Sequence, residues 1–146
     1  EAARTGKYSP QPEKGTGTPG YEGEGSRWRG WIHVLNWDDD GDPEIVARYE
    51  VPEAGSHNIW VENDVMYVGF YNGGLRIVDV SGELMGNLYS QGREIGRFLP
   101  FDPKGFKPNA PKVWGAQPHK GTIFFSDYNS GLWAVKVNDG IGVVDE

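Results

Sequence analysis

The feature that most constrains the fold of this chain is an internal repeat. Residues 56–80 align with residues 113–137 at an offset of 57, without a gap. The match includes three consecutive apolar residues, at 66–68 and 123–125, followed by a shared Tyr-Asn-x-Gly-Leu segment. An ungapped match of this length indicates that one structural unit occurs at least twice, so the fold must be built from repeated units.

Each repeated unit is predicted to contain three short strands. Their residues are rich in aromatic and β-branched side chains, which favour strands. Asn and Gly lie between them, and both residues tolerate the positive φ that tight hairpin turns require. The expected strands are 57–61, 65–71 and 75–80 in the first unit, and 113–117, 122–128 and 132–137 in the second.

A truncated third copy of the unit lies upstream. Residues 30–36 align with residues 74–80 at an offset of 44. A fourth strand is expected after each closing strand, at 44–49, at 94–98 and at 141–144. Four strands per unit at a period of roughly 40–50 residues are typical of a β-propeller.

The predicted fold class is therefore all-β, with about two and a half four-stranded antiparallel propeller blades that form an incomplete ring. Nearly continuous apolar runs at 65–71 and 122–125 are expected for strands that are covered on both faces. A small β-sandwich also uses short strands, but the ungapped repeat argues against it. The expected blades are a partial one at 28–51, a full one at 56–99 and a last one at 113–145.

Residues 1–27 differ in composition from the rest and have little to bury. We expect them to form an extended or disordered N-terminal arm. One interpretation is a dangling tail. The other is an arm laid across a neighbouring subunit, with Tyr8 and Tyr21 as anchors, because aromatic side chains carry much of the contact energy at interfaces.

Composition narrows the range of partners. A formal net charge of −7 disfavours nucleic acid and anionic lipid, because both bind basic surfaces. No apolar run is long enough for a membrane span, and Glu1 does not open a signal peptide, so we expect a processed product or a piece of a longer chain. The absence of cysteine excludes disulfides and thiolate metal sites. This composition fits an extracytoplasmic setting and leaves the cytoplasm open.

Several segments resemble the LVIVD-repeat proteins. Residues 74–81, Gly-Leu-Arg-Ile-Val-Asp-Val-Ser, resemble the closing strand of that family, and residues 56–61, Ser-His-Asn-Ile-Trp-Val, are similar to its H-N-V-x-V strand. Residues 113–121 and 126–133 are similar to its final blade. The resemblance implies a secreted or surface-associated bacterial or archaeal β-propeller and implies no catalytic set. Family members hold a whole ring in one chain, whereas this chain does not.

The segment between residues 36 and 44, which joins the truncated third copy to its fourth strand, is strongly acidic. Oxygen ligands at alternate positions about a glycine turn are how short loops wrap Ca²⁺, although the spacing here departs from the EF-hand pattern. The candidate ligands are Asp38, Asp40, Asp42 and Glu44. The other interpretation, which we expect, is a solvated turn whose geometry is set by Pro43.

No catalytic residue is predicted. His33, His57 and His119 occupy different positions of the repeat, whereas a ring-symmetric metal site needs equivalent ones. No serine or threonine stands in a nucleophile elbow, and no glycine-rich loop has a phosphate-binding pattern. We therefore expect a protein that is not an enzyme and has no cofactor beyond the candidate Ca²⁺.

A chain with too few blades to close a ring leaves the edges of its strands unpaired and the apolar faces of its terminal blades exposed. Natural proteins usually cover both. The expected function is a non-catalytic interaction or structural module of a larger extracytoplasmic assembly, completed by other protein chains: self-copies or the remainder of a longer chain. Expected interface residues in the blades are Trp28, Trp31 and Trp133. One alternative is a ligand-, sugar- or metal-binding propeller, or an enzyme fragment whose active residues lie in missing blades. Another is a repeated subunit of a filament or large complex.

Overall fold

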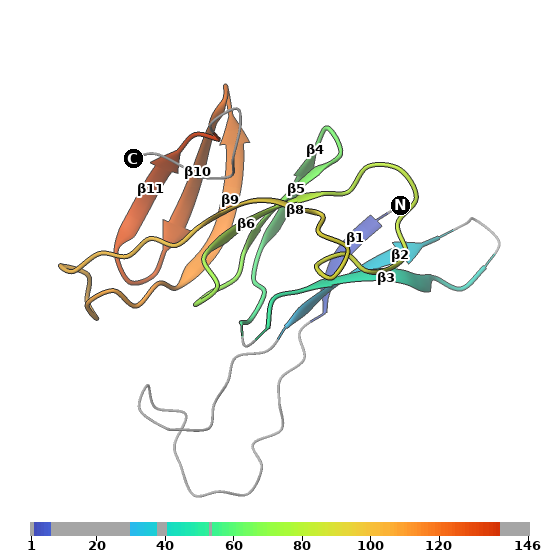
Figure 1. Ribbon diagram of the computed structural model, residues 1–146, viewed down its shortest axis with the longest axis horizontal. Coiled ribbons are helices and arrows are strands. Elements are labelled where there is room, and N and C mark those ends of the chain that lie inside the picture. Colours follow the sequence, from blue (N-terminus) through green and yellow to red (C-terminus); the bar gives the residue numbers. More distant parts are fainter. Residues whose placement is uncertain (1, 7–29, 38–40, 53, 138–146) are drawn as a thin grey trace, which may run out of the picture.

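The computed structural model describes residues 2–6, 30–37, 41–52 and 54–137, with side chains from residue 30 onward. These residues form 11 strands in three mostly antiparallel sheets (Figure 1). The all-β prediction is confirmed for this part of the chain. No helix capable of crossing a membrane occurs among the described residues.

The central sheet and the C-terminal sheet contain the two repeated units. The central sheet has the order β4-β5-β6-β8, with β4 (Ile59–Glu62), β5 (Val65–Gly69), β6 (Leu75–Asp79) and β8 (Glu94–Phe98). The C-terminal sheet has the order β11-β10-β9, with β9 (Val113–His119), β10 (Thr122–Asp127) and β11 (Gly131–Val135). All of these strands were expected from the repeat. The fourth strand expected at 141–144 lies outside the described residues.

The N-terminal sheet has the order β1-β2-β3-β7, and its last strand, β7, runs parallel to β3. Its members are β1 (Ala2–Gly6), β2 (Trp31–Asn36), β3 (Glu44–Glu50) and β7 (Gly86–Asn87). The repeat does not predict β1, because residues 2–6 belong to the expected arm. This part of the arm instead pairs antiparallel with β2, and residues 7–27 lie outside the described part of the chain.

Strand register confirms the ungapped repeat. Tyr67 pairs with Trp60 on one side and Ile77 on the other. Phe124, at the equivalent position of the second unit, pairs with Gln117 and Ala134. The offset of 57 therefore relates not only the sequences but also the pairing of three strands in each sheet.

The alignment of the third copy needs a correction of one residue. Val34 pairs with Ala47 and Ile77 pairs with Gly96, and a β-bulge follows each pair directly. Val34 is thus equivalent to Ile77, and not to Val78 as the sequence alignment predicts. The difference matters because a shift of one residue moves every side chain to the other face of a strand.

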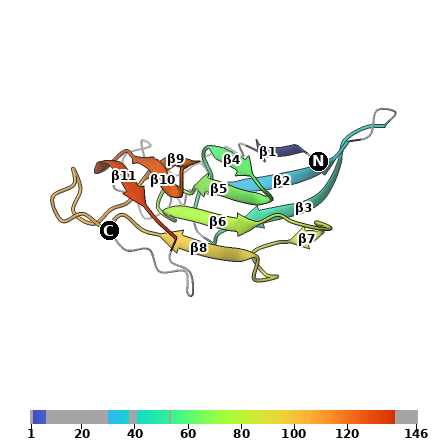
Figure 2. The same ribbon diagram turned by 90° about the horizontal axis from the view of Figure 1, so that it is seen from above.

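Two apolar cores fill the spaces between neighbouring sheets. The first joins the N-terminal sheet to the central sheet and includes Ile32, Val34, Ala47, Tyr49, Met66, Val68, Phe70 and Val78. The second joins the central sheet to the C-terminal sheet and includes Leu75, Ile77, Val113, Ala116, Ile123, Phe125 and Val135. The central sheet lies between the other two (Figures 1 and 2) and is covered on both faces.

The stacking gives each sheet two distinct faces. We call the face directed to the sheet that follows in the chain the forward face, and the face directed to the preceding sheet the back face. Leu75 and Ile77 lie on the forward face of the central sheet, and Met66 and Val68 lie on its back face. With the corrected alignment, Val34 lies on the forward face of its sheet as Ile77 does.

A buried polar cluster crosses the first interface. Arg76 is 5% exposed and its Nη1 lies 3.0 Å from Oε2 of Glu94, while its Nε donates to the carbonyl of Gly73 at 2.7 Å. The hydroxyl of Tyr49, from β3, donates to the same Glu94 carboxylate at 2.6 Å. The cluster joins β3 to β6 and β8, and a buried charge pair is tolerated only when its polar atoms are satisfied in this way.

We expect Arg76→Met to lower the free energy of unfolding by about 3 kcal/mol, because it leaves the Glu94 carboxylate partly buried without its cation. Urea unfolding followed by tryptophan fluorescence measures the change. Arg97→Met, on the exposed neighbouring position of β8, is the control and should cost less than about 0.5 kcal/mol. Equal midpoints for the two variants would contradict a stabilising role for the cluster.

Burial, and next the hydrogen bond to Glu94, raise the pKa of Tyr49 well above its ordinary value of 10.0. The folded state then holds this proton more tightly than the unfolded chain, so stability is complete below pH 10.0 and falls as the pH rises beyond it. We expect Tyr49→Phe to make the alkaline loss of stability shallower. Part of the loss should remain, because burial also raises the pKa of Tyr67 and Tyr71. Unfolding midpoints measured from pH 8 to pH 11 test this, and an unchanged slope would refute it.

Candidate functional site: the uncovered face of the C-terminal sheet

The structure describes half of the predicted calcium loop. Asp42 and Glu44 are exposed, whereas Asp38 and Asp40 lie outside the described residues. Within the described ranges no group of three or more His, Asp or Glu side chains could hold a metal ion. The calcium site therefore stays a prediction that the described residues do not assemble.

The three histidines are on different elements. His33 is half-buried in β2, His57 precedes β4, and His119 is exposed at the end of β9. Nδ1 of His57 is buried and has no hydrogen-bond partner. A catalytic imidazole needs a carboxylate or a carbonyl oxygen to orient it, and His57 has none on that nitrogen.

His57 instead belongs to a stack of rings at the junction of two sheets. Its ring lies parallel to Trp114, with centroids 5.4 Å apart, and Trp114 stacks in turn on Tyr128 at 5.3 Å. Tyr71 meets His57 edge to face at 5.1 Å, and the amine of Lys112 lies 5.9 Å from the Tyr128 ring centroid. These contacts give His57 a structural role in holding the C-terminal sheet on the central sheet.

Backbone contacts close the same junction. The amide of Asn58 donates to the carbonyl of Trp114 at 2.8 Å, and Tyr71 and Val113 exchange a pair of hydrogen bonds at 2.9 and 3.0 Å. The main chain of Gly69 approaches Trp114 so closely that a Cβ there would lie 2.5 Å from its carbonyl carbon. The second interface is therefore tight and specific to a glycine at this position.

The forward face of the C-terminal sheet has no sheet against it in the described structure. Its paired residues include two rows, Gln117–Phe124–Ala134 and Gly115–Ser126–Leu132, and at one end the pair His119–Thr122. Phe124 is 39% exposed and Leu132 is 77% exposed. This face is the candidate functional site.

The repeat supplies an internal standard for that face. Leu75 stands at the position equivalent to Leu132, and it is 0% exposed because the C-terminal sheet covers it. Ile77, equivalent to Ala134, is 2% exposed, and Tyr67, equivalent to Phe124, packs against the same core. The same positions are thus buried in one copy of the unit and open in the next.

The apolar run at 122–125 also indicates that this sheet is built to be covered on both faces. A strand covered on one face normally alternates apolar and polar residues, whereas a continuous run indicates cover on both. In β10, Ile123 and Phe125 are buried against the central sheet, and Phe124 points to the opposite, uncovered face. The sequence of β10 is therefore that of a strand with two apolar neighbours, of which the described structure contains one.

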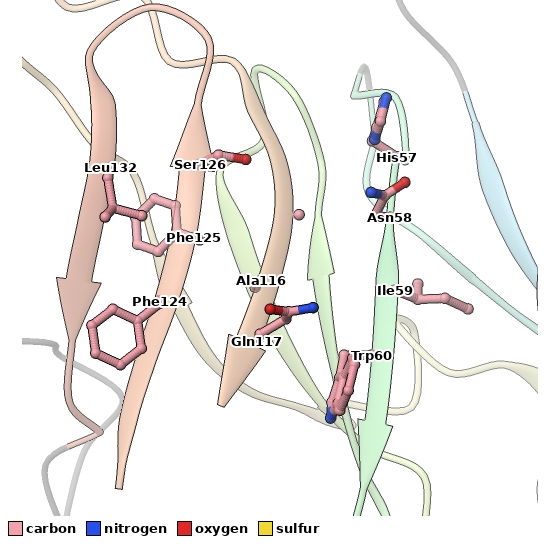
Figure 3. A pocket seen from close by; sticks show the side chains of 11 residues that line it. His57, Asn58, Ile59, Trp60, Ala116, Gln117, Phe124, Phe125, Ser126 and Leu132 are labelled. Carbon is pink, nitrogen blue, oxygen red and sulfur yellow. The ribbon is translucent and has the colours of Figure 1, made fainter. Parts of the chain in front are cut away.

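An open hollow of about 520 Å³ adjoins this face. Its lining residues come from β4, with the residues just before it, and from β9, β10 and β11, across the free edge of β9 (Figure 3). The polar side chains of the lining are His57, Asn58, Trp60, Gln117 and Ser126, and Phe124 and Leu132 contribute apolar surface. The lining carries no carboxylate and no lysine or arginine.

Two of the expected interface tryptophans can be placed. Trp31 lies on the back face of the N-terminal sheet, where it is paired with Glu50 and is 37% exposed. Trp133 packs within the chain, stacked on Phe125 with its centroid 5.6 Å from that of Phe98. The Trp133 ring therefore packs against the second core. Tyr8, Tyr21 and Trp28 lie outside the described residues.

Comparison with known proteins gives no similarity from which to name a family: no family model, no curated protein and no solved structure matches the chain. The resemblance to LVIVD-repeat proteins therefore stays a prediction.

Sequence reasoning did not single out Leu132 and Phe124. The signal was present, because the repeat aligns both with residues of the preceding unit. It could not be used without knowing which face of each strand is directed to the next sheet. A prediction based on aromatic content favoured Trp133, which the alternation of β11 places on the covered face.

We expect Gly69→Ala to destabilise the second interface by about 1–3 kcal/mol, because the added methyl group collides with the main chain of Trp114. Ser126→Ala is the matched control: Ser126 occupies the equivalent position of the C-terminal sheet and is exposed, so its loss should cost less than about 0.5 kcal/mol. Urea unfolding distinguishes the two, and a Gly69→Ala variant as stable as the wild type would contradict the close packing.

Proposed function

We propose that this chain is a non-catalytic interaction module, made of β-propeller blades of the LVIVD-repeat type, whose ring is completed by other protein chains. The observation that carries the proposal is the contrast between Leu75 and Leu132. The residue type and the position in the unit are the same, yet one side chain is 0% exposed and the other 77%. The forward face of the C-terminal sheet is accordingly a docking face.

The arrangement of sheets supports a propeller over other all-β folds. The central and C-terminal sheets each begin with an up-and-down meander, and three successive sheets pack forward face against back face in chain order. Blades of a propeller pack in this way around a common axis. The edge strands β4 and β9 of these two sheets would then lie on the inner side of the ring.

Burial energetics favour a docked partner. Covering a leucine side chain contributes roughly 1.5–3 kcal/mol, and a phenylalanine contributes a similar amount. Association costs several kcal/mol of free energy, because two molecules lose translational and rotational freedom, so these two residues alone give only weak binding. A whole sheet laid on both rows of the face buries enough additional surface to bind stably, as the two internal interfaces do.

The net charge of −7 supports protein as the partner over nucleic acid. We place the module outside the cytoplasm, as part of a larger assembly, on the strength of the family resemblance.

The hollow beside β9 favours a second candidate, a propeller that binds a neutral polar ligand such as a sugar. Asn58 and Gln117 offer amide groups there, and Trp60 offers an indole that is 43% exposed. The two candidates differ at Ala134, which belongs to the docking face but does not line the hollow, so a docked sheet covers it and a small ligand in the hollow leaves it in water.

We expect the full chain to self-associate only weakly, at high micromolar concentration and without forming one defined oligomer, because its uncovered face is apolar, and we expect Leu132→Lys to abolish this association, because a charge on this face cannot be buried without a partner. Sedimentation velocity measures both. Phe106→Lys is the control, since Phe106 is 87% exposed in the loop before β9 and lies outside the docking face. A compact wild-type monomer with cooperative unfolding, unchanged by Leu132→Lys, would contradict the proposed function.

A further inference from the structure

We propose that the partner on the docking face is another β-sheet of the same repeat, with an apolar back face, and that it is not the N-terminal sheet of a second copy of this chain. The inference depends on the proposed function, since it names the partner for the same face. It follows from a comparison of the two interfaces that the chain already contains.

The two internal interfaces differ in one chemical respect. At the first, the forward face presents the Tyr49 hydroxyl, and the back face opposite carries the Arg76–Glu94 pair that this hydroxyl satisfies. At the second, the forward face presents Phe98 at the position of Tyr49, and Phe125 and Trp133 of the back face opposite pack against that ring. The buried Asp127 carboxylate accepts from the Ser130 hydroxyl and the Lys112 amide, so no group of the central sheet is needed to satisfy it. The polar pair on the first back face is thus matched by a polar group on the sheet that covers it, whereas the second interface is closed by aromatic side chains.

The docking face resembles the apolar of these two forward faces. Its rows, Gln117–Phe124–Ala134 and Gly115–Ser126–Leu132, contain no charged group. They are related by the repeat to Tyr67, Leu75 and Ile77, which together cover an apolar back face. The fitting occupant is a sheet whose back face is built like that of the C-terminal sheet.

Ser126 adds a restriction on that occupant. It stands at the position of Gly69, where the absence of a side chain allows the main chain of the next sheet to approach. A side chain at this position holds the first strand of the partner further away. The partner therefore resembles the C-terminal sheet in its apolar face without copying its closest contact.

The N-terminal sheet of a second copy does not fit. Its back face carries His33 and Arg48, which are paired across the strands, and Glu50. Nη2 of Arg48 lies 3.7 Å from Oε1 of Glu50, and the Arg48 side chain is 54% exposed. Docking would bury both charges against two rows of uncharged residues. Glu50 accepts a hydrogen bond from the Asn87 amide, but those rows offer Arg48 no second acceptor of opposite charge, so desolvating the pair costs more than it returns.

The test converts this back face in the full chain. Arg48→Leu combined with Glu50→Gln removes both charges, and the glutamine keeps an oxygen for the amide of Asn87, which donates to Glu50 at 2.8 Å. We expect head-to-tail association with a dissociation constant at least tenfold lower than that of the wild type, and reversal of this gain by Leu132→Lys. Sedimentation equilibrium measures the constants. Arg97→Leu, which removes an exposed charge at the equivalent position of β8, should change nothing.

Each other outcome is decisive. If the double variant associates no more tightly than the wild type, charge on the back face does not select the partner and the inference is wrong. Arg48→Leu alone, which keeps the Glu50–Asn87 bond, gives the same answer should the double variant fail to fold. A wild-type chain that forms one defined oligomer would show that a second copy is the partner, and the proposed function would survive. If Leu132→Lys affects neither protein, the proposed function fails as well.

Discussion

The constraint on which this structure depends is that a sheet with two apolar faces must be covered twice. The central sheet meets it within the chain, because β6 presents Leu75 and Ile77 to one neighbour and Val78 to the other. Neither core would exist without the sheet between them. The C-terminal sheet is built from the same unit and has the same pattern on both faces, but the described residues cover only its back face.

Polar chemistry sets the order in which the sheets stack. Apolar contact between sheets is non-directional, so it cannot by itself decide which sheet follows which. The Tyr49–Glu94–Arg76 cluster can, because the Tyr49 hydroxyl reaches the Glu94 carboxylate only when the N-terminal sheet covers the central one. The ring stack of His57 and Trp114 performs the same task at the second junction. Affinity and order thus arise from different groups in the same interfaces.

The sequence predicted the strands well because the repeat and the turn residues are local signals. It misplaced the upstream copy by one residue because a match of seven residues does not carry the register, and only the pairing of Val34 with Ala47 and of Ile77 with Gly96 sets it. It missed β1, whose residues join a sheet through a partner far along the chain. The docking face was not predicted for a related reason. Leu132 identifies it only once the side chain is known to lie on the face of β11 that is directed away from the central sheet.

The most direct test of the account measures the accessibility of Leu132 when chains associate. The chain has no cysteine, so Leu132→Cys introduces a single thiol whose reaction with a maleimide can be timed. The account predicts that labelling slows at least tenfold between dilute and associated samples, whereas Phe106→Cys reacts equally fast in both. A thiol at position 132 that stays fully reactive in the associated state would show that this face is not the one that docks.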